Sequence, residues 1–295
     1  MRPANCSLLW QSRERSQKNV EILRGEWLHE RFGEAGLPSV FSRAFLTWSL
    51  AELGEFAEGI ARKEETVQIA ETTVDQPFTL SHAYLGVGLP HLRKGDLPQA
   101  IAMLERSLRV CQAGDIQLVL PWAASALGYA YALSGHLAEA LPLLEQAVEQ
   151  SAAAKYMNFY PLLVAHLGEA YLLAGRIEDA SQQARHALER SRDLKQRGHE
   201  AYALQLLGEI AAQRQPPDAE SAAAAYRQAM TLANELGMRP LAAHCHLGLG
   251  TLYARTERLE QARAELSAAM ALYRAVDMTF WLSRAEAALT QVERQ

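Results

Sequence analysis

Two stretches of this sequence, forty residues apart, follow nearly the same pattern. Residues 127–140 read LGYAYALSGHLAEA, and residues 167–180 read LGEAYLLAGRIEDA. Neither stretch contains an obvious catalytic residue. A repeat of this length typically encodes one structural unit that stacks on copies of itself. The pattern therefore constrains the architecture of the chain before it says anything about chemistry.

The pattern can be followed through most of the chain. A glycine recurs inside a short apolar stretch, and a small residue follows each glycine by twelve to fourteen positions. An earlier copy has Thr47 and Gly59 in these two places. Close helix crossings favour Gly and Ala, with larger side chains filling the gaps around them. The pattern thus predicts helix–turn–helix repeats, whose glycines are Gly88, Gly128, Gly168, Gly208 and Gly250 and whose small residues are Ala100, Ala140, Ala180, Ala222 and Ala262.

A turn separates the two halves of most copies, as in KGDLPQA, SGHLAEA and AGRIEDA. Its glycine falls where the first helix must end, a position that favours left-handed backbone geometry. The copy that contains Gly208 has a longer turn, QRQPPDAE, with Pro216 and Pro217. This longer turn explains why the next glycine comes two residues late.

Composition agrees with a helical protein. Ala and Leu dominate, whereas the residues that favour strands are sparse. The net charge of −5 and the pI near 6.0 argue against a nucleic-acid partner. The three cysteines are far apart, and no apolar run is long enough for a signal peptide or a membrane span. We therefore expect a soluble, cytoplasmic protein that binds neither nucleic acid nor membrane.

The spacing resembles that of the tetratricopeptide repeat (TPR), in which leucine and glycine precede an aromatic residue and then alanines. Leu127, Gly128 and Tyr131 match these positions, and the copies at LGEAY and LGTLY match them again. A generic Ala-rich bundle is the alternative, but it predicts no fixed period. The resemblance implies an all-α fold, a right-handed TPR-like superhelical solenoid with ~40-residue helix–turn–helix repeats.

Several longer stretches, among them GLPSVFSRAF and MTFWLSRAEAAL, are similar to the C-terminal repeat region of one class of bacterial signalling proteins. These proteins join a class III nucleotide-cyclase domain to a P-loop ATPase domain. The similarity covers nearly the whole chain after Asn19. It implies a role in bacterial signalling as a TPR scaffold or sensor module.

Three regions are expected along the chain. Residues 1–40 form a partial N-terminal repeat or cap, residues 41–275 form about six helical pairs, and residues 276–295 form a C-terminal capping helix. The stretch SQKNVEILRGEWLHE matches the second helix of an earlier repeat, but residues 1–10 lack the pattern of its first helix. We therefore expect the chain to be the C-terminal part of a longer ancestor, or its true start to lie upstream.

The sequence predicts no enzyme activity, no cofactor and no metal. It has no GxxxxGK[ST] phosphate loop, and the glycines of LGVGLP and LGLGTL lie inside expected helices. His244 and His246 are two residues apart, so on a helix they point about 200° apart and cannot easily share a metal. Contact between distant repeats is not expected in a quasi-linear array, so no histidine can be paired with a nucleophile.

The TPR resemblance also predicts a binding surface, because the first helix of each TPR pair lines the concave face. Rigid aromatic side chains on such a face favour capture of a peptide or protein segment. Three alternatives stay open: some aromatics pack between repeats, the groove senses a small molecule for an associated ATPase or cyclase domain, or the N-terminal face forms an oligomer. The candidate partner-binding residues are Phe41, Trp48, Glu52, His82, Arg93, Trp122, Tyr129, Glu169, Tyr202, Glu209, His244 and Arg255.

Overall fold

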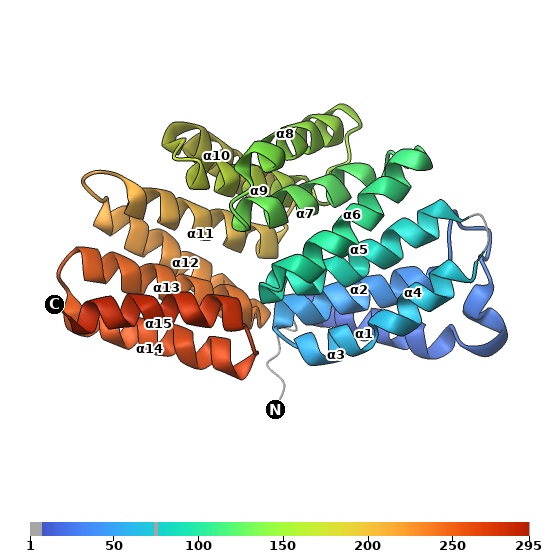
Figure 1. Cartoon of the computed structure of the whole chain (residues 1–295), viewed down its shortest axis with the longest axis horizontal. Coiled ribbons are helices and arrows are strands. Elements are labelled where there is room, and N and C mark those ends of the chain that lie inside the picture. Colours follow the sequence, from blue (N-terminus) through green and yellow to red (C-terminus); the bar gives the residue numbers. More distant parts are fainter. Residues whose placement is uncertain (1–7, 74–75, 295) are drawn as a thin grey trace.

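The computed structural model describes residues 8–73 and 76–294, and its regular elements within this part are all helical. After α1 (Leu8–Ile22) and the short 3-10 helix η1 (Gly25–His29), the helices follow in antiparallel pairs (Figure 1). In the first pair, α2 (Pro38–Leu53) packs against the interrupted helix α3 (Phe56–Ala61) and α4 (Lys63–Glu71). The later elements are α5 (Pro77–Lys94) with α6 (Leu97–Ala113), α7 (Leu120–Leu133) with α8 (Leu137–Ala153), α9 (Tyr160–Leu173) with α10 (Ile177–Asp193), α11 (Arg197–Gln213) with α12 (Ala219–Leu236), α13 (Arg239–Arg255) with α14 (Leu259–Ala275), and finally α15 (Thr279–Glu293).

Within the pairs, a large side chain of the second helix packs on the glycine of the first. A Cβ atom added to Gly128 would lie 2.8 Å from Cγ of Leu144 and 3.1 Å from the carbonyl oxygen of Ala140. Leu144 is fully buried, so it cannot move aside. The repeated glycines are therefore required by close helix approach, as the sequence pattern predicts. The small residues that follow them are also fully buried: Ala100, Ala140, Ala180, Ala222 and Ala262.

One repeat fills this contact from a different helix. α10 has Ala184 where its counterparts have leucine or tyrosine, so this position offers no large apolar side chain to Gly168. A Cβ on Gly168 would instead lie 2.8 Å from Cδ2 of Leu206, which comes from α11 of the next pair. Leu206 is fully buried in the same core cluster as Ala184. A large apolar side chain thus still packs on the glycine, but it comes from α11 of the next pair and not from α10.

The turns between helices use left-handed residues. Gly95, Gly135 and Gly175 have φ angles of 90°, 83° and 74°, which agrees with the expectation for these three turns. In the turn after α7, the N–H of His136 donates to the carbonyl of Tyr131, six residues spanning the end of the helix. α11 ends at Gln213 and α12 begins at Ala219, so the proline-containing turn is indeed the longer one.

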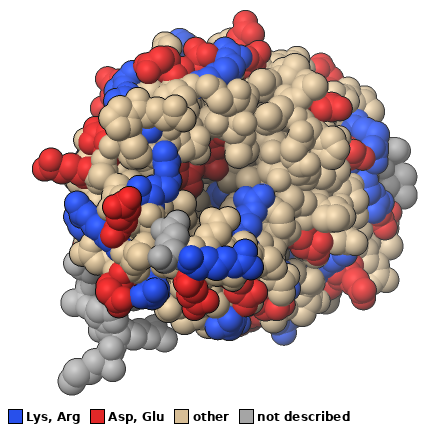
Figure 2. Space-filling model, turned by 60° about the vertical axis from the view of Figure 1, so that its left-hand side comes forward, with Lys and Arg blue, Asp and Glu red and all other residues tan. Residues whose placement is uncertain are grey.

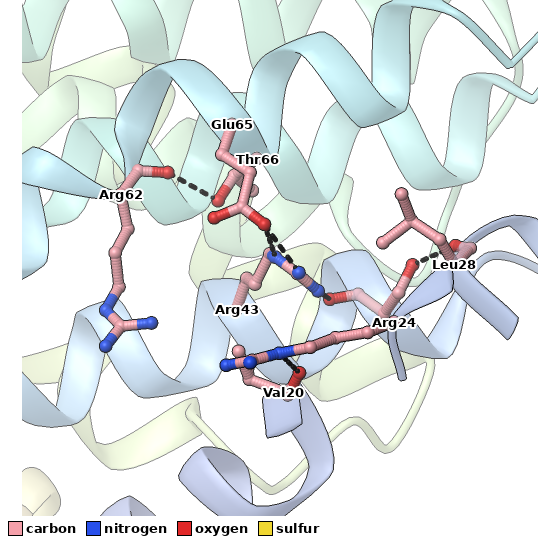
Figure 3. Close-up of polar contacts among 8 residues, drawn as sticks. Val20, Arg24, Leu28, Arg43, Arg62, Glu65 and Thr66 are labelled. Carbon is pink, nitrogen blue, oxygen red and sulfur yellow. Dashed lines mark hydrogen bonds and ion pairs between the residues drawn. The ribbon is translucent and has the colours of Figure 1, made fainter. Parts of the chain in front are cut away.

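The N-terminal segment packs on the first pair and is held by a buried arginine (Figure 3). Arg43 of α2 is 2% exposed and pairs with Glu65 of α4, with 2.7 Å between Nη2 and Oε1. Its Nη1 donates to the carbonyl of Ser39, whose hydroxyl donates in turn to the carbonyl of Leu28 within η1. α1 ends at Ile22, so the expected helix through residue 30 is shorter than predicted. The first helix expected in residues 1–10 falls largely outside the described residues.

The stack curves until its two ends touch. Figure 1 shows α2 and α5 meeting α13–α15 near the middle of the view, with α7–α10 at the top. Arg239 Nε donates to the carbonyl of Leu53 at 2.8 Å, and Lys94 Nζ lies 2.6 Å from Oδ2 of Asp277. We call this contact between α2–α5 and α11–α15 the seam. The expectation that distant repeats do not touch is therefore wrong, because the superhelix is tight enough to close on itself.

Glycines allow the close approach at the seam. Gly54 ends α2 with φ 75°, and a Cβ there would lie 2.9 Å from Cγ1 of Val276. Gly95 ends α5 with φ 90°, and a Cβ there would lie 2.9 Å from Cβ of Phe280. A side chain at either position would be strained and would also push the seam apart. The two sides of the seam are consequently closely packed against each other.

Candidate functional site

Three predicted binding residues from three different helix pairs meet inside the superhelix. Glu52 of α2 accepts hydrogen bonds from Nε of Arg93 on α5 at 2.9 Å and from the hydroxyl of Tyr202 on α11 at 2.6 Å. Trp48 Nε1 donates to the same carboxylate at 3.0 Å. Burial alone would lower the pKa of Arg93, but the Glu52 carboxylate outweighs it, and the pKa is raised. We call Glu52, Arg93 and Tyr202 the interior triad.

The interior triad is an ion pair with little access to water. The side chains of Glu52 and Arg93 are 4% and 10% exposed. The guanidinium carbon of Arg93 also lies 4.4 Å from the centre of the Tyr202 ring, a cation–π geometry. Removing one member of the triad would therefore leave the others largely buried without their partner.

A second polar pair lies one repeat further along, between α7 and α9. The hydroxyl of Tyr129 donates to Oε2 of Glu169 at 2.5 Å, and the Tyr129 ring stacks on His166 with 4.3 Å between ring centres. His166 Nδ1 is 3.1 Å from the hydroxyl of Ser125. Burial raises the pKa of Glu169 to about 7, although the Tyr129 hydrogen bond and the charge of Arg93 act in the opposite direction. Burial, followed by the charge of Arg93, lowers the pKa of His166 well below its usual value.

Glu209 of α11 continues the row of acidic side chains. It accepts a hydrogen bond from the amide of Gln205, one turn earlier. Burial and then the negative charge of Glu169 raise the pKa of Glu209 to about 8. Within residues 8–73 and 76–294, no Lys or Arg nitrogen lies within 4.0 Å of the carboxylates of Glu169 or Glu209, in contrast to Glu52. The interior therefore holds more acidic than basic groups when all are ionised, and Figure 2 shows that the surface is hollowed on one face, with charged side chains of both signs around the hollow.

The predicted aromatic residues Trp48 and Trp122 belong to a cluster that joins α2, α7 and the start of α9. Trp122 stacks on Phe159 with 4.1 Å between ring centres and an interplanar angle of 12°. Trp48 meets both rings edge-on, at 5.5 Å from Trp122 and 5.2 Å from Phe159. The Phe45 ring lies 6.3 Å from the Trp122 ring, measured between centres, with an interplanar angle of 26°. These aromatics pack between repeats, but Trp122 and Phe159 also line a cavity of about 300 Å³ together with Phe45 and His82.

The other predicted residues make their hydrogen bonds and ring contacts with residues outside the interior triad. Phe41 and His82 form a small ring cluster with Phe78, at 4.7 Å between the centres of Phe41 and His82. His244 Nδ1 is 2.7 Å from the hydroxyl of Tyr273, so it belongs to the C-terminal core. Arg255 is exposed at the end of α13 and donates to the carbonyl of Ala212.

Residues that were expected to be structural are packed. Gly86 lies within α5, and a Cβ there would be 2.6 Å from Cβ of Ala44, so helix packing accounts for the glycines of LGVGLP. Tyr171 and Tyr253 are buried at 8% and 4%, whereas Tyr131 is half-buried and donates to Glu105. Among the described residues, no group of three or more His, Cys, Asp or Glu side chains could hold a metal, and no helix is long and apolar enough to cross a bilayer.

The structure adds residues that sequence reasoning missed. His166 and His199 lie close to the interior triad, and Phe45 and Phe159 complete the aromatic cluster. Phe45 lies one turn after Phe41 on the same helix, so helical phase could have found it. Phe159 precedes the first residue of α9, where the repeat pattern gives no information.

The comparisons with known proteins agree on the class of fold. The family model described as tetratricopeptide repeat matches residues 79–153, so the chain carries TPR sequence in this region. The apo form of RapI is similar in structure, with a TM-score of 0.65 at 10% identity over 90% of each chain. A Rap protein complexed with competence and sporulation factor gives a TM-score of 0.62 at 11% identity, over 97% of this chain and 86% of that chain.

A third similar structure is the signal transduction ATPase with numerous domains, a protein from Pyrococcus horikoshii with a tetratricopeptide repeat sensor. The TM-score is 0.58 at 16% identity, over 98% of this chain and 44% of that chain. None of the curated proteins matches this chain in sequence. At these identities the similarity shows the fold alone, and it confirms the prediction of an all-α, TPR-like solenoid of paired helices.

Proposed function

We propose that this protein is a non-catalytic TPR scaffold or sensor module that holds a peptide or protein segment inside its superhelix, in bacterial signalling in the cytoplasm. The observation that supports this proposal most strongly is the gathering of Glu52, Arg93, Tyr129, Glu169, Tyr202 and Glu209 from α2, α5, α7, α9 and α11 on one interior surface. Side chains from many repeats can read an extended segment along its length. The Rap protein whose structure includes competence and sporulation factor supports the same reading of the fold.

Partner capture by matched variants tests this proposal. Tyr129→Phe combined with Glu169→Gln removes the hydrogen bond and the ionisable carboxyl group of one interior pair with little change in volume. We expect at least about a tenfold loss of partner recovered on the immobilised protein, measured by quantitative mass spectrometry, because groups at the centre of an interface carry most of its energy. Glu149→Gln, on the exposed face of α8, is the control and should recover the partner as the unchanged protein does. Equal recovery by the interior variant would rule out the interior as the binding surface.

A second function is favoured by the cavities and by the similarity to a TPR sensor protein. In this alternative the chain is a small-molecule-sensing arm that regulates an associated ATPase or cyclase domain. The cavity of about 300 Å³ beside Trp122 is large enough for a small ligand. A metabolite that binds only the folded chain would raise its melting temperature with concentration, whereas a protein partner would be recovered by capture.

A further inference from the structure

A second cavity, of about 240 Å³, lies at the seam. Trp48 and Glu52 of α2 form one wall, and Gly198, His199 and Tyr202 at the start of α11 form the other, with Met238 between α12 and α13. We call it the seam cavity. Its surface is mostly apolar, and two of its side chains are aromatic. The wall residues come from helices about 150 positions apart in sequence, so the cavity exists only while the superhelix is closed.

The charges at the seam cavity are already compensated. Glu52 is paired with Arg93, and Arg197 at the edge of the cavity is paired with Glu235. A charged occupant would therefore find no free counterion and would lose its hydration. The apolar wall and this balance of charge favour a neutral occupant. A neutral aromatic ring fits best, because the rings of Trp48 and Tyr202 and the thioether of Met238 all make favourable contacts with one.

His199 gives the cavity a hydrogen-bond acceptor. The side-chain amide nitrogen of Gln196 donates to the carbonyl of Asn158 at 2.9 Å, which leaves Oε1 of Gln196 as an acceptor. His199 Nδ1 lies 2.9 Å from that Oε1, so Nδ1 carries the proton. Burial lowers the pKa of His199 to about 4, so the ring is neutral near pH 7. The Nε2 atom consequently has a lone pair, and no donor among the described residues reaches it.

We propose that the seam cavity binds a planar aromatic group that carries one N–H or O–H donor, such as an indole or a phenol, with the donor directed at Nε2 of His199. The ring would lie against Trp48 of α2 and Tyr202 of α11 and so would bridge both sides of the seam. The inference rests on the proposed binding function and names the chemistry that the seam recognises. The ring can come from a tryptophan or tyrosine side chain of the bound segment or from a free aromatic compound.

Titration of the full chain with indole by isothermal calorimetry tests the proposal. We expect indole to bind with a Kd in the range of about 10 μM to 1 mM. 1-Methylindole keeps the ring but lacks the donor, and it should bind about 3- to 10-fold more weakly. Indole-3-acetate and tryptamine add a charge of either sign and should also bind more weakly than indole. Equal affinity for indole and 1-methylindole would overturn the role of His199.

Gly198→Leu blocks the cavity without disturbing the helix. A Cβ on Gly198 would lie 3.7 Å from Sδ of Met238, an ordinary contact, and its φ angle suits any residue. Indole binding should be lost in this variant while the circular dichroism spectrum and melting temperature are kept. Ala102→Leu, exposed on α6, is the matched control and should bind indole normally. Binding of indole to Gly198→Leu with unchanged affinity would place the ligand elsewhere and overturn the proposal.

The source of the ring is decided by a capped pentapeptide with a central tryptophan. Binding of both this peptide and indole, each blocked by Gly198→Leu, identifies a side chain as the occupant, whereas binding of indole alone identifies a free compound. His199→Phe should abolish the difference between indole and 1-methylindole in either case. Indole binding without any partner recovered in the capture experiment would leave this inference intact and reject the proposed function. Absence of binding by every aromatic probe would reject this inference and leave partner capture to be judged separately.

Discussion

The apolar contacts within and between the helix pairs, which we call the stack, and the interior of the superhelix are stabilised by different interactions. In the stack, Leu144 packs on Gly128 within a core of fully buried alanines and leucines. In the interior, Glu52, Arg93 and Tyr202 meet through hydrogen bonds and an ion pair. The stack is local, since its partners are sixteen residues apart, whereas Tyr202 lies 150 residues from Glu52.

This difference separates stability from specificity. Apolar contacts between repeats gain free energy from burial and are indifferent to what lies in the interior. Buried polar groups contribute little net stability when satisfied, yet they are costly when one partner is missing. The stack therefore determines how the helix pairs pack, whereas the interior triad determines where the two ends of the superhelix meet. Variants in the two regions should fail in different ways.

The largest effect is expected for Glu52→Leu. This change leaves the Arg93 guanidinium buried without its counterion, and it also removes the acceptor of Tyr202 and Trp48. We expect a loss of about 3–5 kcal/mol in the free energy of unfolding, measured by urea denaturation. The seam should also open, so the radius of gyration from small-angle X-ray scattering should increase while helical content is kept.

The control for this variant is Glu52→Leu combined with Arg93→Met. Removing both charges should recover most of the lost stability, because apolar side chains of similar volume can replace a buried ion pair. If the double variant is as unstable as the single one, the ion pair is not the cause. An unchanged radius of gyration in Glu52→Leu would show that the seam does not depend on the interior triad.

Gly128→Leu should have a smaller effect and a different signature. A Cβ there would lie 2.8 Å from Cγ of Leu144, too short for contact, and in tight contact at 3.1 Å with the carbonyl oxygen of Ala140, so α7 and α8 must separate. Overpacking of this kind costs about 1–3 kcal/mol. The variant should lose helical content at a lower urea concentration with no opening of the seam beforehand. Gly198→Leu is the matched control, since its Cβ has ordinary contacts, and it should stay within about 0.5 kcal/mol of the unchanged protein.

The sequence predicted the stack well because the stack is periodic. Gly128, Ala140 and their counterparts recur at nearly fixed spacing, and most of the glycines meet the second helix of their own pair, Gly168 being the exception. Phase within the TPR pattern also placed Glu52, Arg93 and Tyr202 on one surface, although it could not show that they touch. The position of each residue around the first helix of its pair thus indicated a shared interior surface. It did not indicate which of these residues form hydrogen bonds with one another.

The seam could not be predicted because closure depends on a sum over many small rotations. Each helix pair is rotated slightly relative to the previous one, and no single residue determines the total rotation. Arg239, which donates to Leu53 across the seam, has no feature that marks it in the sequence. The seam cavity is hidden for the same reason, since Trp48 and His199 become neighbours only when the superhelix closes.

The smallest effect is a pH dependence of stability set by Glu169 and Glu209. Their pKa values in the folded chain are raised to about 7 and about 8 from an ordinary value near 4.5. The folded state therefore holds these protons more tightly than the unfolded state, and the resulting stability is fully present below pH 4.5. It is lost as the pH rises through the folded pKa values, so it is absent by about pH 8.5.

Glu209→Gln should remove the part of this dependence that comes from Glu209, because glutamine has nearly the same shape without the charge. We expect the variant to be more stable than the unchanged protein by about 1 kcal/mol at pH 8.5, since partial access to water reduces the full linkage effect. At pH 5 the two proteins should differ little, because Glu209 is protonated in the folded chain. Urea denaturation of both proteins at pH 5 and at pH 8.5 measures these two differences. A constant difference between the two proteins from pH 5 to 8.5 would show that Glu209 is already charged in the fold, and it would remove the contrast between an apolar stack and an acidic, proton-binding interior.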